Sequence, residues 1–168
     1  MTKEVSKSKL FLARLVVVLM VAFVVVGFAQ YGFSAEVRAR IWQNLLERWG
    51  APMNFRFVLQ PVMATIAALL DGLKDARTGR PPFLETIITN PAKRAGRMQE
   101  AVIATARIIL LGLVMDTIYQ VMEFKTFHPA EAVIIALLLA FVPYVVLRGI
   151  IARIARWWIG LQSAGASR

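Results

Sequence analysis

The stretch from Ala101 to Tyr119 limits the possible folds of this chain more than any other feature. Only Arg107 and Asp116 interrupt its apolar residues, and about 20 apolar residues are what a helix needs to cross a bilayer. Asn90, which a proline follows, is placed to cap the start of the same helix in water. The sequence therefore predicts a helix that crosses a membrane over residues 101–122.

Three further apolar segments predict that the chain crosses the membrane about four times. Hydrophobic residues make up 58% of its 168 residues, above the roughly 45–50% of soluble globular proteins. The expected fold is therefore all-α, a polytopic membrane protein with a single integral membrane domain over residues 1–168. Its expected transmembrane helices cover residues 11–33, 55–73, 101–122 and 130–150.

Two of these spans are open to another interpretation. The first has a basic start, an apolar core and a weak cleavage motif, so it also fits a secretory signal peptide. The second is the weakest, because Gln60 and Pro61 interrupt a short apolar run. Pro61 is expected either to kink this helix or to start its regular part. Ala64 and Ala68 give the same helix a small-residue face that another helix could approach closely.

Two segments have the pattern of helices that lie in the membrane interface. Residues 35–49 alternate apolar and charged side chains at helical spacing, with two tryptophans on the apolar side. Residues 148–161 place arginines among isoleucines and the pair Trp157-Trp158. Both are predicted to be amphipathic segments at the membrane surface. For residues 35–49, packing on the protein's own loops is the alternative.

Residues 79–89 are predicted to form the main loop, because Gly79 ends one helix and Pro81-Pro82 prevents another from starting at once. Phe83, Leu84, Ile87 and Ile88 in this loop are expected to lie among the lipid headgroups.

The distribution of lysine and arginine predicts the orientation of the chain. Fourteen of the 20 fall in the N-terminal tail, the connection 74–97 and the C-terminal tail, whereas five fall in the two connections on the other side. Cytoplasmic segments of membrane proteins carry the excess of these residues, so both termini are expected in the cytoplasm. The basic residues flank apolar runs, which favours anionic lipid over nucleic acid as the partner of the +10 net charge.

Four arginines are expected to contact lipid headgroups. They are Arg107, Arg148, Arg153 and Arg156. Arg107 cannot pair with Asp116 within one helix, because nine residues separate the two by about 14 Å along the axis and by half a turn around it. Arg107 is therefore expected to extend toward the headgroups or to contact Glu100.

A polar stripe on the 101–122 helix is the candidate functional feature. Asp116 is expected near the middle of the membrane, where an ionised carboxylate costs at least about 2.5–3.5 kcal/mol unless it is paired. Its role is either helix docking, through a hydrogen bond, or a proton or ion site. The residues assigned to this docking or ion site are Asp116, Gln60, Thr65, Tyr119 and Gln120.

The sequence offers little for catalysis or for a cofactor. There is no cysteine, and His128 is the only histidine, so the chain by itself cannot supply a zinc site of the usual Cys and His ligands. No phosphate-binding glycine loop or nucleophile motif occurs. The carboxylates of Asp71, Asp75 and Glu85 are expected to be ion-pair partners in a solvated loop. We expect a protein that is not an enzyme and that binds no cofactor or metal.

Four stretches of the chain carry a resemblance to known sequences. They are FRFVLQPVMATIAALLDGLKDARTGRPPF, ATARIILLGLVMDTIYQ, PAEA and FVPYVVLRG. Together they resemble a group of small, uncharacterised bacterial inner-membrane proteins, over about residues 50 to 160. The resemblance implies location in a bacterial inner membrane, and it brings no activity, cofactor or binding residue.

Three functions from different classes fit these features. The first is a non-enzymatic accessory or assembly subunit that docks other membrane subunits or a second copy of itself. The second is a small oligomeric proton or ion transporter, or a channel, that uses Asp116. The third is an enzyme that acts on lipids at the cytoplasmic face through the loop from Asp71 to Arg80.

Overall fold

The computed structural model describes residues 6–32, 39, 42–43 and 55–165, and all of its regular elements are helices. Four helices are long and apolar enough to cross a membrane, which confirms the predicted all-α, polytopic fold. Each overlaps one of the expected spans. Their bounds are Lys7–Tyr31, Phe57–Arg77, Pro91–Glu123 and Pro129–Gly160.

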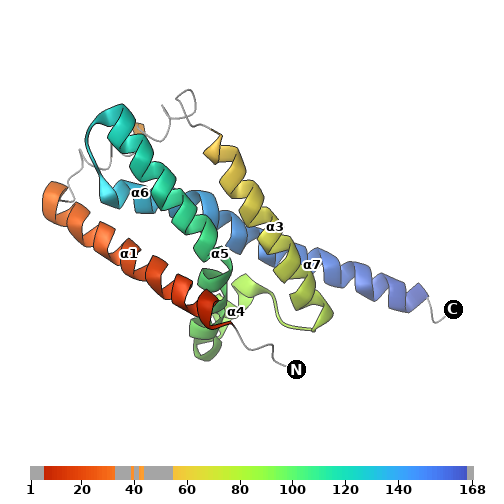
Figure 1. Cartoon of the computed structure of the whole chain (residues 1–168). Helices are drawn as coiled ribbons and strands as arrows, with labels where there is room; N and C mark the ends of the chain where they lie inside the picture. The colour runs from red at the N-terminus through yellow and green to blue at the C-terminus, as the bar shows by residue number, and fades with distance from the viewer. Residues whose placement is uncertain (1–5, 33–38, 40–41, 44–54, 166–168) are drawn as a thin grey trace.

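The helices form an open assembly in which α5 lies between α1 and α3 (Figure 1). The helix α1 packs against α5 and α6, whereas α3 packs along α7 and also contacts α5. The C-terminal part of α7 extends past the end of α3 (Figure 1). The elements are α1 (Lys7–Tyr31), α3 (Arg56–Arg77), α4 (Phe83–Thr89), α5 (Pro91–Tyr119), η2 (Gln120–Phe124), α6 (Pro129–Ala136), η3 (Leu137–Phe141) and α7 (Val142–Gly165).

Small residues let the helices approach one another closely. A Cβ atom on Gly27 would lie 2.5 Å from the Cβ of Ala130, and one on Gly112 would lie 3.1 Å from the Cβ of Ala136. Ala64 and Ala68 are both fully buried. The small-residue face of α3 is therefore used for packing inside this chain, so it does not offer a surface to another subunit.

Local sequence rules account for several helix ends. The Asn90 side chain accepts a hydrogen bond from the backbone N of Lys93 at 3.3 Å, which confirms the predicted N-cap. Pro61 lies inside α3, which already begins at Arg56. The π-helical turn η3 ends directly before the helix α7 that carries Pro143. A widened turn is a common device where a proline interrupts the regular hydrogen bonds of a long helix.

The predicted loop 79–89 contains the short helix α4. We expected Phe83 to lie among the lipid headgroups, and this is wrong, because its side chain is fully buried against α5 and α7. Ile88 in the same helix is 71% exposed, as expected for a side chain at the headgroups.

The two predicted interfacial segments have different outcomes. Residues 35–49 lie outside the described residues, except Ala39, Trp42 and Gln43, which are helical. Residues 148–161 continue α7 without a break. The side chains of Trp157 and Trp158 near its end are exposed.

Candidate functional site: two buried polar clusters

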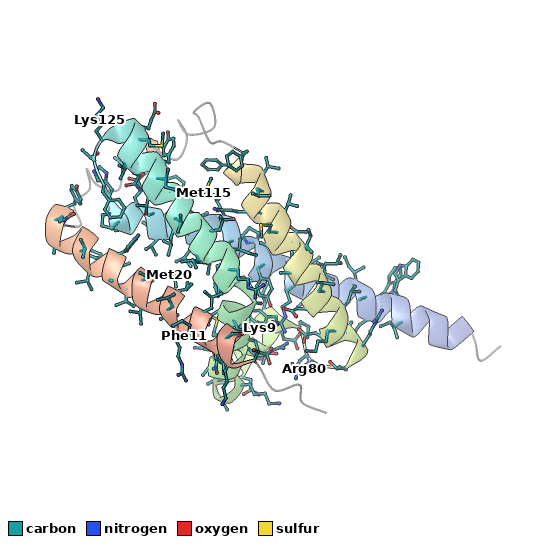
Figure 2. All side chains as sticks on the ribbon, viewed as in Figure 1. Lys9, Phe11, Met20, Arg80, Met115 and Lys125 are labelled. Atoms are coloured by element: carbon teal, nitrogen blue, oxygen red, sulfur yellow. The ribbon has the colours of Figure 1, made fainter. Side chains whose placement is uncertain are left out.

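Charged side chains from three helices meet at one end of the assembly. We call this group the arginine cluster, and it consists of Asp71 and Asp75 on α3, Arg97 and Glu100 on α5, and Tyr144 and Arg148 on α7. Figure 2 places Arg80, which borders the cluster, at the same end as Lys9 and at the opposite end from Lys125. The cluster therefore lies where α1 begins and α3 ends.

Asp75 is the centre of the arginine cluster. Its side chain is 1% exposed. Arg97 donates to it from both terminal nitrogens, at 3.2 Å and 3.3 Å, and Arg148 donates from Nε at 2.8 Å. A carboxylate that accepts a fork of two bonds is held in orientation as well as in position. Asp75 therefore joins all three long helices of this part of the fold.

Glu100 joins the same arginines from the more exposed side. Its Oε2 accepts from Arg97 at 3.1 Å and from Arg148 at 3.1 Å, and its Oε1 accepts from Arg80 at 3.2 Å. Its side chain is 42% exposed. These outer pairs stabilise the fold less than the buried ones, because solvent screens them.

Aromatic rings complete the arginine cluster. Tyr144 donates its hydroxyl to Asp71 at 2.6 Å and accepts from Arg148 at 2.9 Å. The guanidinium carbons of Arg148 and Arg97 lie 4.7 Å and 5.4 Å from the centre of the Phe83 ring. A cation this close to a ring face is attracted to it. These contacts explain why α4 packs into the assembly.

The structure corrects three predictions about these residues. Arg148 was expected to contact lipid headgroups, but its side chain is 4% exposed and its donors are bound inside the chain. Asp75 was expected in a solvated loop, but it is buried in the last turns of α3. The expected contact of Arg107 with Glu100 is also not formed, since Glu100 accepts from three other arginines.

The other three arginines that were predicted to contact lipid headgroups lie nearer the surface. Arg107 is exposed, and the side chain of Arg153 is 67% exposed and lies 3.9 Å from Glu85. Arg156 is partly exposed and donates from Nε to the carbonyl of Ala152. For these three, contact with lipid headgroups stays a prediction.

A second polar group, which we call the Asp116 cluster, lies at the other end of α5. It consists of Asp116, Gln120 and the backbone of His128, to whose carbonyl the backbone N of the buried Glu131 also donates. Gln120 donates to Asp116 at 2.6 Å and to the carbonyl of His128 at 3.3 Å, and accepts from the backbone N of His128 at 2.6 Å. Asp116, Gln120 and Glu131 are all buried. Gln120 therefore fixes the connection between α5 and α6.

Asp116 was expected near the middle of the membrane, and the structure places it nearer one end of the helices. It lies 19 residues, or about 28 Å, beyond Arg97 along α5. One turn further on, Gln120 already binds the loop that leads into α6. Asp116 therefore belongs to the end of the assembly opposite the arginine cluster.

The other residues assigned to the Asp116 site divide into two groups. Gln60 and Tyr119 are buried, and Gln60 lies beside Gly112, one turn from Asp116. The Gln60 Oε1 atom has no hydrogen-bond partner among the described residues. Thr65, one of the alternative hydrogen-bond partners expected for Asp116, is exposed and donates to the carbonyl of Pro61 at 2.7 Å.

An apolar layer separates the two clusters. Two buried polar residues are described within it: the Thr105 hydroxyl donates to the carbonyl of Ala101 at 2.8 Å, and Gln60 lies beside Gly112. Two separate polar side chains do not form a continuous polar path between the clusters in the described part of the assembly. The buried apolar side chains of the layer are those of Ala64, Ala68, Ala106, Ile109, Leu113 and Ala140.

No protein-family model, curated protein or solved structure matches this chain. Its function must therefore be argued from the geometry above. Among the described residues, no group of three or more His, Cys, Asp or Glu side chains is placed to hold a metal ion.

Sequence reasoning missed the arginine cluster, although part of its signal was present. Asp71 and Asp75 lie on the same helical face as the buried Ala64 and Ala68, and Tyr144 and Arg148 are also four residues apart. A carboxylate on the buried face of a helix needs a partner. The position of Asp75 on this face could have indicated that it is buried. It could not have indicated which arginine binds it.

Proposed function

We propose that this chain is a non-enzymatic integral protein of a bacterial inner membrane that serves as an accessory or assembly subunit of a larger membrane complex. The observation that supports this proposal is the arginine cluster. Its carboxylates and guanidiniums bind one another, which is the behaviour of a structural network. Asp75 has its oxygens occupied by two arginines, which argues against its use as a base in a lipid-modifying enzyme.

The proposed partners are anionic lipid and other membrane subunits or a second copy of this chain, and not nucleic acid. The support comes from the C-terminal part of α7. There Ile154, Trp157 and Trp158 are exposed beside the exposed Arg153. Tryptophan and arginine side by side on a helix are typical of a segment at headgroup depth.

A small oligomeric proton or ion transporter, or a channel, is the second candidate. It is favoured by the burial of Asp116, which Gln120 contacts, and by the burial of Glu131 on α6, because ionisable residues in a membrane often mark ion paths. The apolar layer argues against it, since a path through this chain would have to cross that layer. An oligomer could provide a path between its copies.

The test of the two candidates combines purification with transport. We expect the chain, extracted in mild detergent, to retain a stoichiometric partner that mass spectrometry identifies, and to show no proton or ion flux in liposomes. A chain that purifies alone and carries a flux would favour the transporter.

Substitutions of Asp116 sharpen this test. Asp116→Asn keeps an acceptor for Gln120, so we expect near wild-type thermal stability and partner retention. Asp116→Leu removes it and should cost about 0.6–2 kcal/mol for each hydrogen bond lost within the membrane. A wild-type flux that Asp116→Asn abolishes would contradict the accessory role, because asparagine keeps the hydrogen bond but cannot titrate.

The proposed orientation, with both termini in the cytoplasm, is tested by labelling single cysteines in intact cells. Ser8, Thr78 and Thr126 are exposed in the structure. We expect cysteines at Ser8 and Thr78 to be protected from a membrane-impermeant thiol reagent, and a cysteine at Thr126 to be labelled, because the cytoplasmic side carries the excess of lysine and arginine. Labelling of Thr78 with protection of Thr126 would reverse the orientation.

A further inference from the structure

A cleft of about 320 Å³ opens beside the arginine cluster, between α4 and the first turns of α5. This volume is at the lower end of the range of small-ligand sites, roughly 300–1,000 Å³. Three cationic side chains line it, Arg80, Lys93 and Arg97, against one carboxylate, Glu100. The lining therefore has a net positive charge, which favours an anionic ligand.

The three cationic side chains differ in how many N–H donors they have free for a ligand. Arg97 uses both terminal nitrogens on Asp75, Glu100 and the carbonyl of Pro81, so it contributes through its charge. Arg80 uses only Nη1 among the described hydrogen bonds and is 44% exposed. The Lys93 ammonium has no carboxylate within ion-pair distance in the described part of the chain. Arg80 and Lys93 are thus the donors open to a ligand.

The backbone of α5 is also accessible from the cleft. Gly96 lines it, and a Cβ atom added to this residue would meet nothing within 4 Å. Ala92, one turn earlier, is also small. The N-terminal end of a helix carries a partial positive charge, which adds to the attraction for an anion.

The position of the cleft relates it to the membrane surface. Arg80 lies three residues beyond the end of the span Phe57–Arg77, and the cleft faces the connection between that span and the next. This is the depth at which phospholipid headgroups lie when the two spans cross a bilayer.

We propose that this cleft binds the phosphate of an anionic phospholipid headgroup, through Lys93 and Arg80. The inference rests on the membrane location and the anionic lipid partner of the proposed function, for which it names a site, and it holds whether or not the chain is a subunit of a larger complex. Lysine binds phosphate as a point charge, and arginine binds it with a fork of N–H donors. The acyl chains would lie against the apolar outer faces of the neighbouring spans.

The test uses the full chain in mild detergent, titrated with mixed micelles that contain phosphatidylglycerol or phosphatidylcholine, with bound lipid counted by native mass spectrometry. Lys93→Gln removes one of the two cationic side chains that are open to a ligand. Gly96→Leu places a large side chain in the cleft. Lys74→Gln is the matched control, since Lys74 is exposed on α3 and does not line the cleft. Thermal unfolding of each variant verifies that it is folded.

We expect wild type to retain phosphatidylglycerol over phosphatidylcholine, and Lys93→Gln to bind it about fivefold more weakly, the effect of one basic residue at an anionic surface. Gly96→Leu should reduce retention at least as much, and Lys74→Gln should not. Glycerol phosphate should compete, since it carries a phosphate group on the same glycerol unit. If glycerol phosphate binds and phosphatidylglycerol does not, the lipid assignment is overturned. If Lys93→Gln and Lys74→Gln lose phosphatidylglycerol equally, or if folded Gly96→Leu retains it fully, the cleft is not the binding site.

Discussion

Replacing Asp75 with leucine is expected to destabilise the folded chain by about 3–5 kcal/mol, the cost of removing one partner from a buried ion pair. The cost is this large because Asp75 accepts from both Arg97 and Arg148, and the substitution leaves two buried guanidiniums short of a carboxylate. Thermal or denaturant unfolding in mild detergent measures the change.

Two further variants separate the ion network from general damage to the helices. Glu85→Gln removes an exposed carboxylate that lies 3.9 Å from Arg153, and we expect a change within about 0.5 kcal/mol. The double variant Asp75→Leu with Arg148→Leu should cost less than the sum of the two single variants, since the pair is then removed together. Strict additivity would show that Asp75 and Arg148 are not coupled.

Gly27→Ala is expected to destabilise the contact between α1 and α6 by about 1–3 kcal/mol, the usual cost of overpacking. The added methyl would lie 2.5 Å from the Cβ and 2.8 Å from the backbone N of Ala130. Neither distance is tolerated, so α1 must move away from α6. Loss of thermal stability in mild detergent is the measurement.

A compensating change and an open-space control accompany Gly27→Ala. Adding Ala130→Gly removes the obstructing methyl group, so the double variant should recover part of the lost stability. Gly96→Ala adds the same methyl group where nothing lies within 4 Å, and it should stabilise α5 by about 0.5–1 kcal/mol through its helix propensity. A neutral Gly27→Ala would show that α1 does not depend on this close approach.

Features that are determined within a single helix could be predicted from the sequence, whereas contacts between helices could not. The length of the apolar runs predicted four spans, and the order of Asn90 and proline predicted a cap, because both effects act within one helix. The partner of Asp75 depends on how α3 and α7 cross, across 73 residues of chain, and no local pattern specifies that. Phe83 was placed at the headgroups for the same reason, since its burial comes from α5 and α7.

The Asp116 site also combines a contact within one helix, which was predictable, with contacts between segments, which were not. Gln120 lies four residues from Asp116 on the same helix, so helical spacing alone put these two side chains together. The binding of Gln120 to the peptide of His128 depends on the return of the chain after the π-helical turn η2, ending at Lys125 with a φ of 51°. Thr65 was assigned to the same site, but its side chain is exposed on α3 and donates to the carbonyl of Pro61.

The separation of Asp75 from Arg148 along the chain has a consequence for biosynthesis. A ribosome makes α3 first and α5 next, so Arg97 can reach Asp75 while α7 has not yet been made. Arg148 on α7 is made last. Only then can it donate to Asp75 on α3 and to Glu100 on α5. During that interval the nascent chain holds charged groups near the membrane without their full set of partners, which is costly there. The interval ends when α7 is made, so the arginine cluster is completed only after all of its helices are present.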